Sequence, residues 1–238
     1  MEHRAKESYA IQSVDNALSL LEAMGDERGD FALTDLSTRL GLNKSSVFRL
    51  LATFEGRGYV ETVEESKTYR LASSAFEIGR KLLLRNDLLQ QARPVMERLA
   101  RECGESIYLA VRRGGEVLFL HMVDSGQKVT VMSLVGHRYP LEGNAPGRLF
   151  LALGRESLSG DGLEVIRRQG YAVDRDGLGV GIDALAAPLG GVAGDLSGAL
   201  CLIAPAFRLG DERLEKELLE RLVAGGRMVE ARLGWRRR

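Results

Sequence analysis

Apolar residues recur at helical intervals in the front part of the chain. Spacings of three and four residues predict a first amphipathic helix over 13–24, whose inward face we expect to consist of Val14, Ala17, Leu18 and Leu21. A shorter helix is predicted over 35–40, because Leu36 and Leu40 share one face. Gly41 follows this helix and has the conformational freedom that a tight turn needs.

The third predicted helix, Lys44 to Arg57, combines an apolar stripe with a polar, basic start. Asn43 is a typical capping residue before it, and the stripe consists of Val47, Leu50, Leu51 and Phe54. The polar side chains at its start are Lys44, Ser45, Ser46 and, one turn on, Arg49. Two short helices joined by a glycine turn, the second opening with small hydroxyl and basic residues, are typical of a helix-turn-helix that places its second helix in the major groove.

A β-hairpin is predicted directly after these helices. The β-forming segments 59–63 and 68–71 flank the polar turn 64–67, and this hairpin would be the wing of a winged helix-turn-helix. Residues 1–75 contain 9 Lys or Arg against 12 Asp or Glu, yet the segment 39–57 carries a local charge of +3, the sign that a phosphate-facing edge needs. An ordinary three-helix cap with a hairpin is the alternative that the pattern leaves open.

The back part of the chain predicts a mixed α/β domain rich in turns, since 22 of the 28 glycines follow residue 86. The helical pattern over 75–101 contains Pro94, so we predict a linker helix up to Asn86 and a second helix with Pro94 in its first turn. Further on, we expect strands over 106–112, 116–122, 129–134, 184–192 and 196–204, and helices over 146–154, 164–169 and 211–233.

Composition narrows the class of protein. The 33 Lys and Arg balance the 33 Asp and Glu, so any nucleic-acid site must be local. Two cysteines are too few for a disulfide framework and indicate a reducing compartment. The uncharged stretch 196–207 is shorter than the about 18 residues of a membrane helix, and no apolar segment follows the opening MEHRAKES, so we expect a cytoplasmic protein without membrane contact.

Enzyme and metal chemistry find little support in the sequence. The three histidines form no HxxxH pattern, no CxxC motif is present, and no GxSxG elbow marks a nucleophile. The glycine runs GLGVG and GGVAG lack the strand and helix setting of a dinucleotide site and the lysine of a P-loop. We therefore expect no catalytic residues, no metal and no cofactor.

Several segments resemble the IclR-type bacterial transcriptional regulators. SVDNALSLLEAM, LTDLSTRLGLNKSSVFRLLATFEGRGYV and TYRLASSAFEIGR are similar to that family's winged helix-turn-helix. GHRYPLEGNAPGRLFLALG, GYAVDRDGLGVGIDALAAPL and GALCLIAPAFRL are similar to its effector-binding domain, so the resemblance covers nearly the whole chain. It implies an α+β protein: a winged helix-turn-helix (1–74), a linker helix (75–90) and a GAF-like α/β domain (91–238) for effector binding and oligomerisation.

The resemblance also implies site residues. The positions that match the family's recognition helix are Lys44, Ser45, Ser46, Arg49 and, farther along, Thr53, and we add Lys67 on the wing as a DNA contact. The positions that match its ligand-contacting loop and pocket are Gly143, Asn144, Ala145, Asp174, Ala184, Cys201 and Ile203. In the loop, backbone and side-chain donors would hold an anionic or carbonyl group.

This chain departs from the family pattern in the pocket. Members that bind small organic acids often have a cysteine at the position of Ala184 and serines at the positions of Cys201 and Ile203, and Gly177 replaces a commonly acidic residue. Losing these polar partners disfavours a small, highly charged effector, because its desolvated carboxylate would lack hydrogen bonds. We predict a larger, more apolar or aromatic effector than glyoxylate or pyruvate; plain core substitutions in a sensor with a shifted site are the alternative.

The sequence thus predicts a sequence-specific DNA-binding regulator, repressor or activator, that acts as a homodimer or dimer of dimers on a double-stranded operator and responds to a small organic effector. The alternative is a small-molecule-binding or hydrolytic α/β domain whose helical front is a protein-interaction module.

Overall fold

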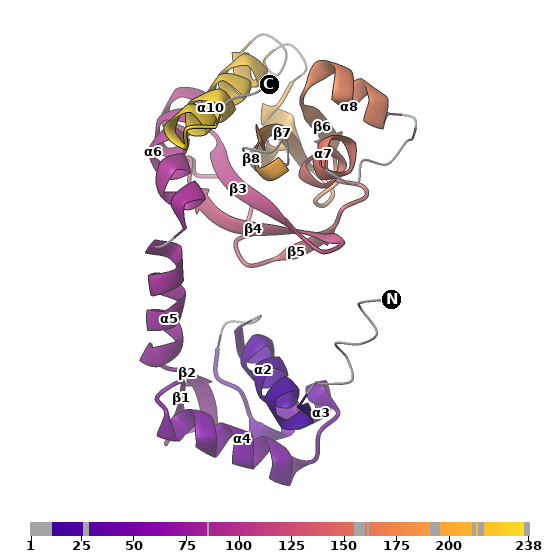
Figure 1. Ribbon diagram of the computed structural model, residues 1–238. Coiled ribbons are helices and arrows are strands. Elements are labelled where there is room, and N and C mark those ends of the chain that lie inside the picture. The colour runs from indigo at the N-terminus through magenta and orange to yellow at the C-terminus, as the bar shows by residue number, and fades with distance from the viewer. Residues whose placement is uncertain are drawn as a thin grey trace. The chain divides into compact units, whose positions relative to one another are not determined.

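The computed structural model describes residues 11–25, 29–84, 86–154, 160, 162–190, 196–210, 213 and 217–235. The chain divides into two compact units, residues 1–84 and 85–238 (Figure 1). The expected limits of the linker helix, 75 and 90, stay predictions.

Among the described residues, the N-terminal unit contains three helices and a hairpin, followed by one more helix. In order they are α2 (Gln12–Gly25), α3 (Leu33–Leu40), α4 (Lys44–Gly56), β1 (Val60–Val63), β2 (Thr68–Leu71) and α5 (Ser73–Leu84). Leu20, Leu36, Val47 and Leu51 are fully or almost fully buried at the centre of its core. The predicted helices and hairpin are confirmed to within two residues at each end.

The predicted inward face of α2 is wrong at Val14 and Leu18, while Ala17 and Leu21 are half-buried. Val14 is 51% exposed and Leu18 55% exposed, whereas Leu20, Ala23 and Met24 are buried. Apolar residues lie on two faces of this helix, and periodicity alone does not say which one packs against α3 and α4. The face that includes Ile11, itself 66% exposed, is left as an apolar stripe outside the core.

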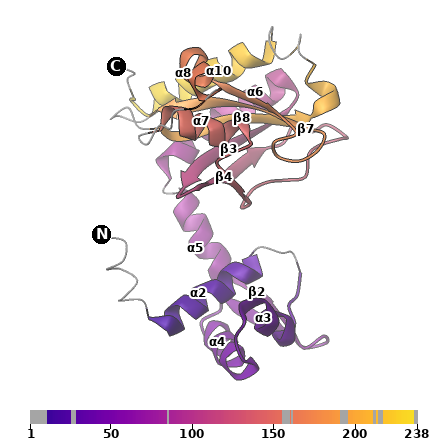
Figure 2. The same cartoon turned by 90° about the vertical axis from the view of Figure 1, so that its right-hand side faces the viewer.

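The C-terminal unit is a six-stranded antiparallel sheet with helices on both faces (Figures 1 and 2). Its strands lie in the order β5-β4-β3-β8-β7-β6. Their bounds are β3 (Ser106–Arg113), β4 (Glu116–Val123), β5 (Arg138–Pro140), β6 (Ala172–Arg175), β7 (Ile182–Gly190) and β8 (Leu196–Pro205). The helices are α6 (Asp87–Cys103), α7 (Ala145–Leu153), α8 (Leu163–Gln169) and α10 (Leu219–Arg232), with a short 3-10 turn over Ala206–Arg208.

Each face of the sheet has its own apolar core. Leucines from α6 and α10 pack against leucines of β7 and β8 on one face, Leu99 and Leu222 among them. Phe150 of α7 and Ile166 of α8 cover the other face, where the sheet presents several alanines beside large side chains such as Tyr108 and Phe119. The fold is therefore α+β, as predicted, with α7 lying over this mixed face.

Three predictions for this unit need correction. Residues 129–134 form no strand; β5 instead pairs with the edge of β4, and Met132 is 79% exposed. Pro94 lies inside α6 rather than in its first turn, because the Asn86 side chain caps the helix earlier by accepting a hydrogen bond from Leu89 N, 3.0 Å away, and the proline ring is exposed. The strand β6 was not predicted. The N-terminal part of the predicted last helix lies largely outside the described residues.

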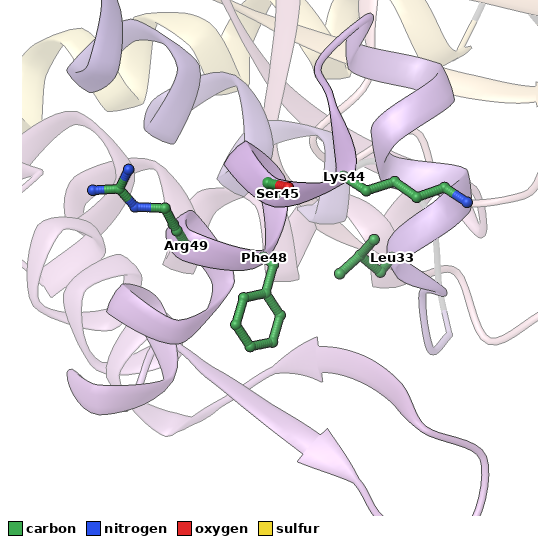
Figure 3. Close-up of a pocket in the computed structure, with 5 residues that line it drawn as sticks. All are labelled: Leu33, Lys44, Ser45, Phe48 and Arg49. Carbon is green, nitrogen blue, oxygen red and sulfur yellow. The ribbon is translucent and has the colours of Figure 1, made fainter.

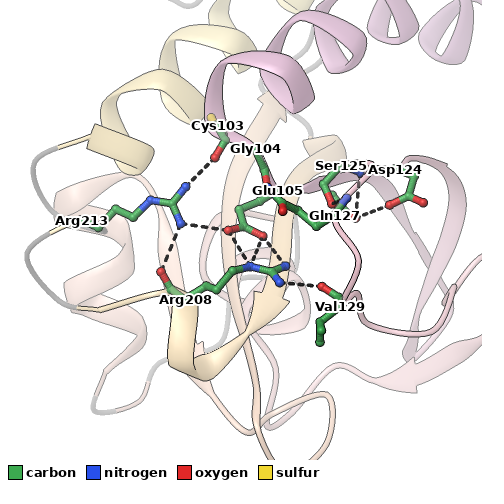
Figure 4. Close-up of polar contacts among 10 residues, drawn as sticks. Cys103, Gly104, Glu105, Asp124, Ser125, Gln127, Val129, Arg208 and Arg213 are labelled. Atoms are coloured by element: carbon green, nitrogen blue, oxygen red, sulfur yellow. Dashed lines mark hydrogen bonds and ion pairs between the residues drawn. The ribbon is translucent and has the colours of Figure 1, made fainter.

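A buried carboxylate holds the start of β3 (Figure 4). Glu105 is 1% exposed and accepts hydrogen bonds from Arg208, at 2.7–3.1 Å, and from Arg213, at 2.9 Å. Arg208 also donates to the Val129 carbonyl and Arg213 to the Cys103 carbonyl. One carboxylate therefore ties the end of α6, the 3-10 turn and the loop after β4 together.

Candidate DNA-contacting helix and effector site

The connection between α3 and α4 has the geometry of a helix-turn-helix. Gly41 ends α3 in the left-handed conformation, with φ +63°, and Ser37 Oγ donates a 2.6 Å hydrogen bond to the Leu42 carbonyl. Asn43 caps α4, as predicted, since its side chain accepts a 2.8 Å hydrogen bond from Ser46 N. The start of α4 is thus fixed in direction by local contacts.

The structure places the predicted contact residues of α4 along its outer face. Lys44, Ser45 and Arg49 are exposed, whereas Ser46 is half-buried. Thr53 is also exposed, but its hydroxyl donates a 2.8 Å hydrogen bond to the Arg49 carbonyl and so can only accept from another partner. Lys67 is exposed in the turn between β1 and β2, with φ +54°.

One exposed residue of α4 was missed in the sequence. Phe48 is 55% exposed and lines a hollow with Lys44, Ser45, Arg49 and, from α3, Leu33 (Figure 3). Its position alone could have revealed it, because it lies outside the apolar stripe but one turn after Lys44 and Ser45.

The four predicted pocket residues of the sheet share one face. Asp174 of β6, Ala184 of β7 and Ile203 of β8 are direct neighbours across the strands. Cys201 lies two residues from Ile203 on the same face and pairs with Tyr108 of β3. All four are buried, and Ala184, Cys201 and Ile203 belong to the core cluster that includes Phe150 of α7.

The predicted loop donors are already engaged within the protein. Asn144 caps α7: its Oδ1 accepts a 2.9 Å hydrogen bond from Gly147 N, and its Nδ2 donates a 2.6 Å hydrogen bond to the Pro140 carbonyl. Ala145 N donates to one carboxylate oxygen of Asp174, and Gly177 N donates to the other at 3.3 Å. The Asp174 carboxylate therefore already lies where the N-terminus of α7 would attract an anion.

Burial sets the protonation of this carboxylate. Asp174 is 7% exposed, and burial raises its pKa to about 6 even though the hydrogen bonds from Ala145 and Gly177 lower it. A second anion placed beside Asp174 would meet like charge above that pH.

Gly177 is required by close packing rather than by its backbone angle. A Cβ at this position would lie 2.2 Å from the Gly143 carbonyl oxygen and 2.8 Å from Cγ of Asp174. The loop that follows β6 therefore packs directly on the loop before α7, and no side chain fits between them. An acidic side chain at this position would therefore require these two loops to move apart.

Tyr108 was also missed in the sequence. It is fully buried on the face that holds Cys201, and its hydroxyl has no hydrogen-bond partner among the described residues. Burial raises its pKa to about 12 even though the nearby Leu134 backbone lowers it, so the hydroxyl is protonated and its proton can still be donated. Polar atoms buried without a partner are rare, and each calls for an explanation.

Other chemistry has no counterpart in the part of the chain that the structure describes. No group of three or more His, Cys, Asp or Glu side chains is arranged to hold a metal ion there. None of the described helices combines the length and apolarity needed to cross a membrane. Cys103 and Cys201 are free and buried, and burial raises the pKa of both thiols.

Family models match most of the chain. The model described as IclR helix-turn-helix domain matches residues 13–64, and the one described as Bacterial transcriptional regulator IclR C-terminal matches 80–161 and 155–231. Among curated relatives, the chain is 29% identical to the HTH-type transcriptional regulator KdgR of Escherichia coli K12 over 97% of this chain and 95% of the relative.

Solved structures share the same fold. An IclR transcriptional regulator from Alicyclobacillus acidocaldarius has a TM-score of 0.82 at 25% identity and covers 94% of this chain and 99% of that one. An IclR homologue from Microbacterium hydrocarbonoxydans, solved in complex with 4-hydroxybenzoate, has a TM-score of 0.79 at 24% identity and covers 93% of this chain and 99% of that one.

Proposed function

The chain belongs to the IclR family of bacterial transcriptional regulators, and we propose that α4 enters the major groove of an operator while a small organic effector in the C-terminal unit alters operator affinity. The matched families are regulators and not enzymes, which leaves the hydrolytic alternative without support. Its place of action is then the cytoplasm, where its operator lies.

The observation that carries the DNA-binding proposal is the exposed face of α4. Lys44 and Ser45 stand in its first turn and Arg49 one turn later, all exposed, on a helix whose opposite face is buried in the core. Lys44 supplies a phosphate contact and Arg49 grips a phosphate or a guanine edge. Ser46, Thr53 and, on the wing, Lys67 add further contacts.

A salt titration tests the role of Lys44. Duplexes that bind the purified chain are first selected from a random-sequence pool, and their affinity is then measured at increasing salt concentration. Lys44→Ala weakens binding and reduces the slope of log affinity against log salt by about one, because one phosphate contact is lost. Lys128→Ala, which removes an exposed lysine of the C-terminal unit, is the matched control and leaves the slope unchanged. Equal slopes for Lys44→Ala and the unaltered chain would remove Lys44 from the interface.

We further propose that the chain works as a homodimer or dimer of dimers. An apolar stripe is formed by Ile11, just before α2, and by Val14 and Leu18 on α2. Each of these residues is more than half exposed, and clustered exposed apolar side chains mark interaction surfaces. A second copy is the occupant that two-fold operator recognition requires, since paired helices then reach half-sites one DNA turn apart. Val14→Glu therefore lowers the mass measured by sedimentation equilibrium. Val165→Glu on α8, where the valine is 44% exposed, is the control; a monomeric unaltered chain would refute the dimer.

For the effector, we propose a compound that is larger and more apolar or aromatic than glyoxylate or pyruvate. Ala184 and Ile203 contribute no polar side-chain atoms beside Asp174, and the loop donors at Asn144 and Ala145 are engaged internally. The Gly143 carbonyl packs against Gly177, so no side chain fits between the two loops at this point. The buried Tyr108 hydroxyl, close to Cys201 in the sheet, gains a partner when such an effector carries a hydroxyl or carbonyl oxygen. The homologue solved with 4-hydroxybenzoate is consistent with this class.

A thermal-shift panel of short keto acids, aromatic acids and neutral aromatic compounds tests this effector class. A ligand that binds only the folded protein raises its melting temperature by mass action. We expect a rise with aromatic compounds and none with glyoxylate or pyruvate at equal concentration. A rise with the short acids alone would contradict the proposal.

A further inference from the structure

Phe48 is a large aromatic side chain exposed in the middle of the proposed DNA-contacting face. It is 55% exposed, while its neighbours Val47 and Leu51 are fully buried in the core. Figure 3 shows its ring projecting between Lys44 and Arg49, whose charged ends extend to opposite sides.

Core packing does not account for this ring. The core of the N-terminal unit is made by the opposite face of α4 together with α2, α3 and the hairpin, and the aromatic contact of α4 with the hairpin start uses Phe54 and Tyr59, with ring centroids 6.1 Å apart. An exposed phenyl ring gains free energy when an apolar group covers it, in proportion to the apolar area removed from water. The position therefore favours contact with an apolar group that approaches from outside.

We propose that Phe48 determines operator specificity by contacting the 5-methyl group of a thymine in the major groove. This inference rests on the proposed DNA-binding function. The thymine methyl is the apolar group that the major groove displays, and apolar side chains recognise it by direct contact. One face of α4 then makes two kinds of contact. The polar residues Ser45 and Arg49 bind phosphates and polar base edges, and the ring of Phe48 discriminates thymine from cytosine and from uracil.

Charge around the ring selects nucleic acid over an apolar protein partner. The hollow that Phe48 lines also contains Lys44 and Arg49, and the segment 39–57 carries three net positive charges. A phosphate backbone neutralises Lys44 and Arg49, whereas an apolar protein surface would desolvate these two side chains without offering them an anion.

The test compares duplexes selected from a random-sequence pool by the unaltered chain and by Phe48→Ala. We expect the unaltered chain to select a T·A pair at a position where Phe48→Ala accepts other pairs. Replacing that thymine by deoxyuridine removes only the methyl group, and the affinity of the unaltered chain then falls about fourfold, the free energy of one buried methyl expressed as a ratio. The affinity of Phe48→Ala does not change with this replacement.

Two controls separate the ring from general effects. Lys44→Ala binds more weakly to every duplex yet still loses about fourfold on the replacement, because its phenyl ring remains in place. Phe48→Ala unfolds at the same temperature as the unaltered chain to within a few degrees, as expected for an exposed position.

The outcomes distinguish the inference from the function on which it rests. If the unaltered chain selects no sequence, the DNA-binding proposal fails, and this inference with it. If it selects an operator but deoxyuridine has no effect at any thymine, or the same effect in Phe48→Ala, DNA binding stands and the role of Phe48 is overturned. A lower mass of Phe48→Ala in sedimentation would likewise overturn it, because the ring would then face a second copy of the chain.

Discussion

Replacing Asp174 by asparagine removes the charge that burial makes unfavourable in the proposed effector site. In the folded protein the pKa of Asp174 is raised from 3.8 to about 6, chiefly by burial. The ionised carboxylate of Asp174 is therefore less favoured, relative to the protonated form, in the folded protein than in the unfolded chain. Ionisation of Asp174 lowers the folding stability as the pH rises through this window, and the loss is complete above about pH 7.

The size of the effect follows from the two pKa values. A difference of about two units corresponds to about 3 kcal/mol when the carboxylate is fully ionised in both states. Between about pH 4.5 and about pH 7.5 the contribution of Asp174 to the free energy of unfolding changes by about 2 kcal/mol, because the carboxyl group of the unfolded chain is already mostly ionised at the lower pH. Asparagine has one acceptor oxygen and keeps only one of the two hydrogen bonds from Ala145 N and Gly177 N. This loss adds a constant offset, which cancels when the two pH values are compared.

Urea unfolding at the two pH values measures this change. Trp235 is the one tryptophan of the chain and lies in the C-terminal unit, so its fluorescence follows the unit that holds Asp174. We expect Asp174→Asn to become more stable relative to the unaltered chain by about 2 kcal/mol on going to the higher pH. Asp176→Asn removes an exposed carboxylate from the same loop and is the matched control. A relative stability of Asp174→Asn that is unchanged or falls with pH would refute the reasoning, since the hydrogen bonds from Ala145 and Gly177 would then outweigh burial.

Three further substitutions test the packing of the C-terminal unit. Glu105→Gln leaves two guanidinium groups without their carboxylate, and we expect urea titrations to show a free energy of unfolding lower by about 3–5 kcal/mol. Glu116→Gln is the control, because Glu116 forms an exposed pair with Arg138, and it changes the free energy of unfolding by less than about 1 kcal/mol. Similar losses in the two variants would contradict the buried cluster. Gly177→Ala forces the loop away from the Gly143 carbonyl and costs about 1–3 kcal/mol by the same measurement, while Gly115→Ala, where a Cβ meets nothing within 4 Å, has little effect. Tyr108→Phe removes an unpaired buried hydroxyl, so it raises the melting temperature of the effector-free protein. It also reduces the rise in melting temperature that a hydroxyl-bearing aromatic ligand causes. A lower melting temperature of the effector-free variant would show that the hydroxyl has a partner.

The DNA-binding half was predictable because its signals are local. The Asn43 cap, the Gly41 turn and the stripe of Val47 and Leu51 act within a few residues of one another, and the structure confirms each. The face of α2 was not predictable, since Val14 and Leu20 belong to two apolar faces and only the packing of α3 and α4 chooses between them.

The effector half depends on contacts between distant segments. The Asp174 carboxylate accepts the hydrogen bond from Ala145 N because β6 pairs with β7 and α7 packs nearby. No local sequence pattern predicts these contacts. Residues 129–134 have the composition of a strand, but β5 and not this segment pairs with β4. The family resemblance gave the positions to inspect, and their hydrogen bonds came only from the fold.

Coupling between the two units is the central claim, and operator affinity measured with and without an effector tests it most directly. A ligand that raises the melting temperature in the panel is titrated into the complex of the chain with its selected duplex, and binding is followed by fluorescence anisotropy. We expect operator affinity to change by about 5- to 150-fold at saturating ligand, the usual range of coupling between two sites. A ligand that stabilises the protein yet leaves operator affinity unchanged would contradict regulation through this site.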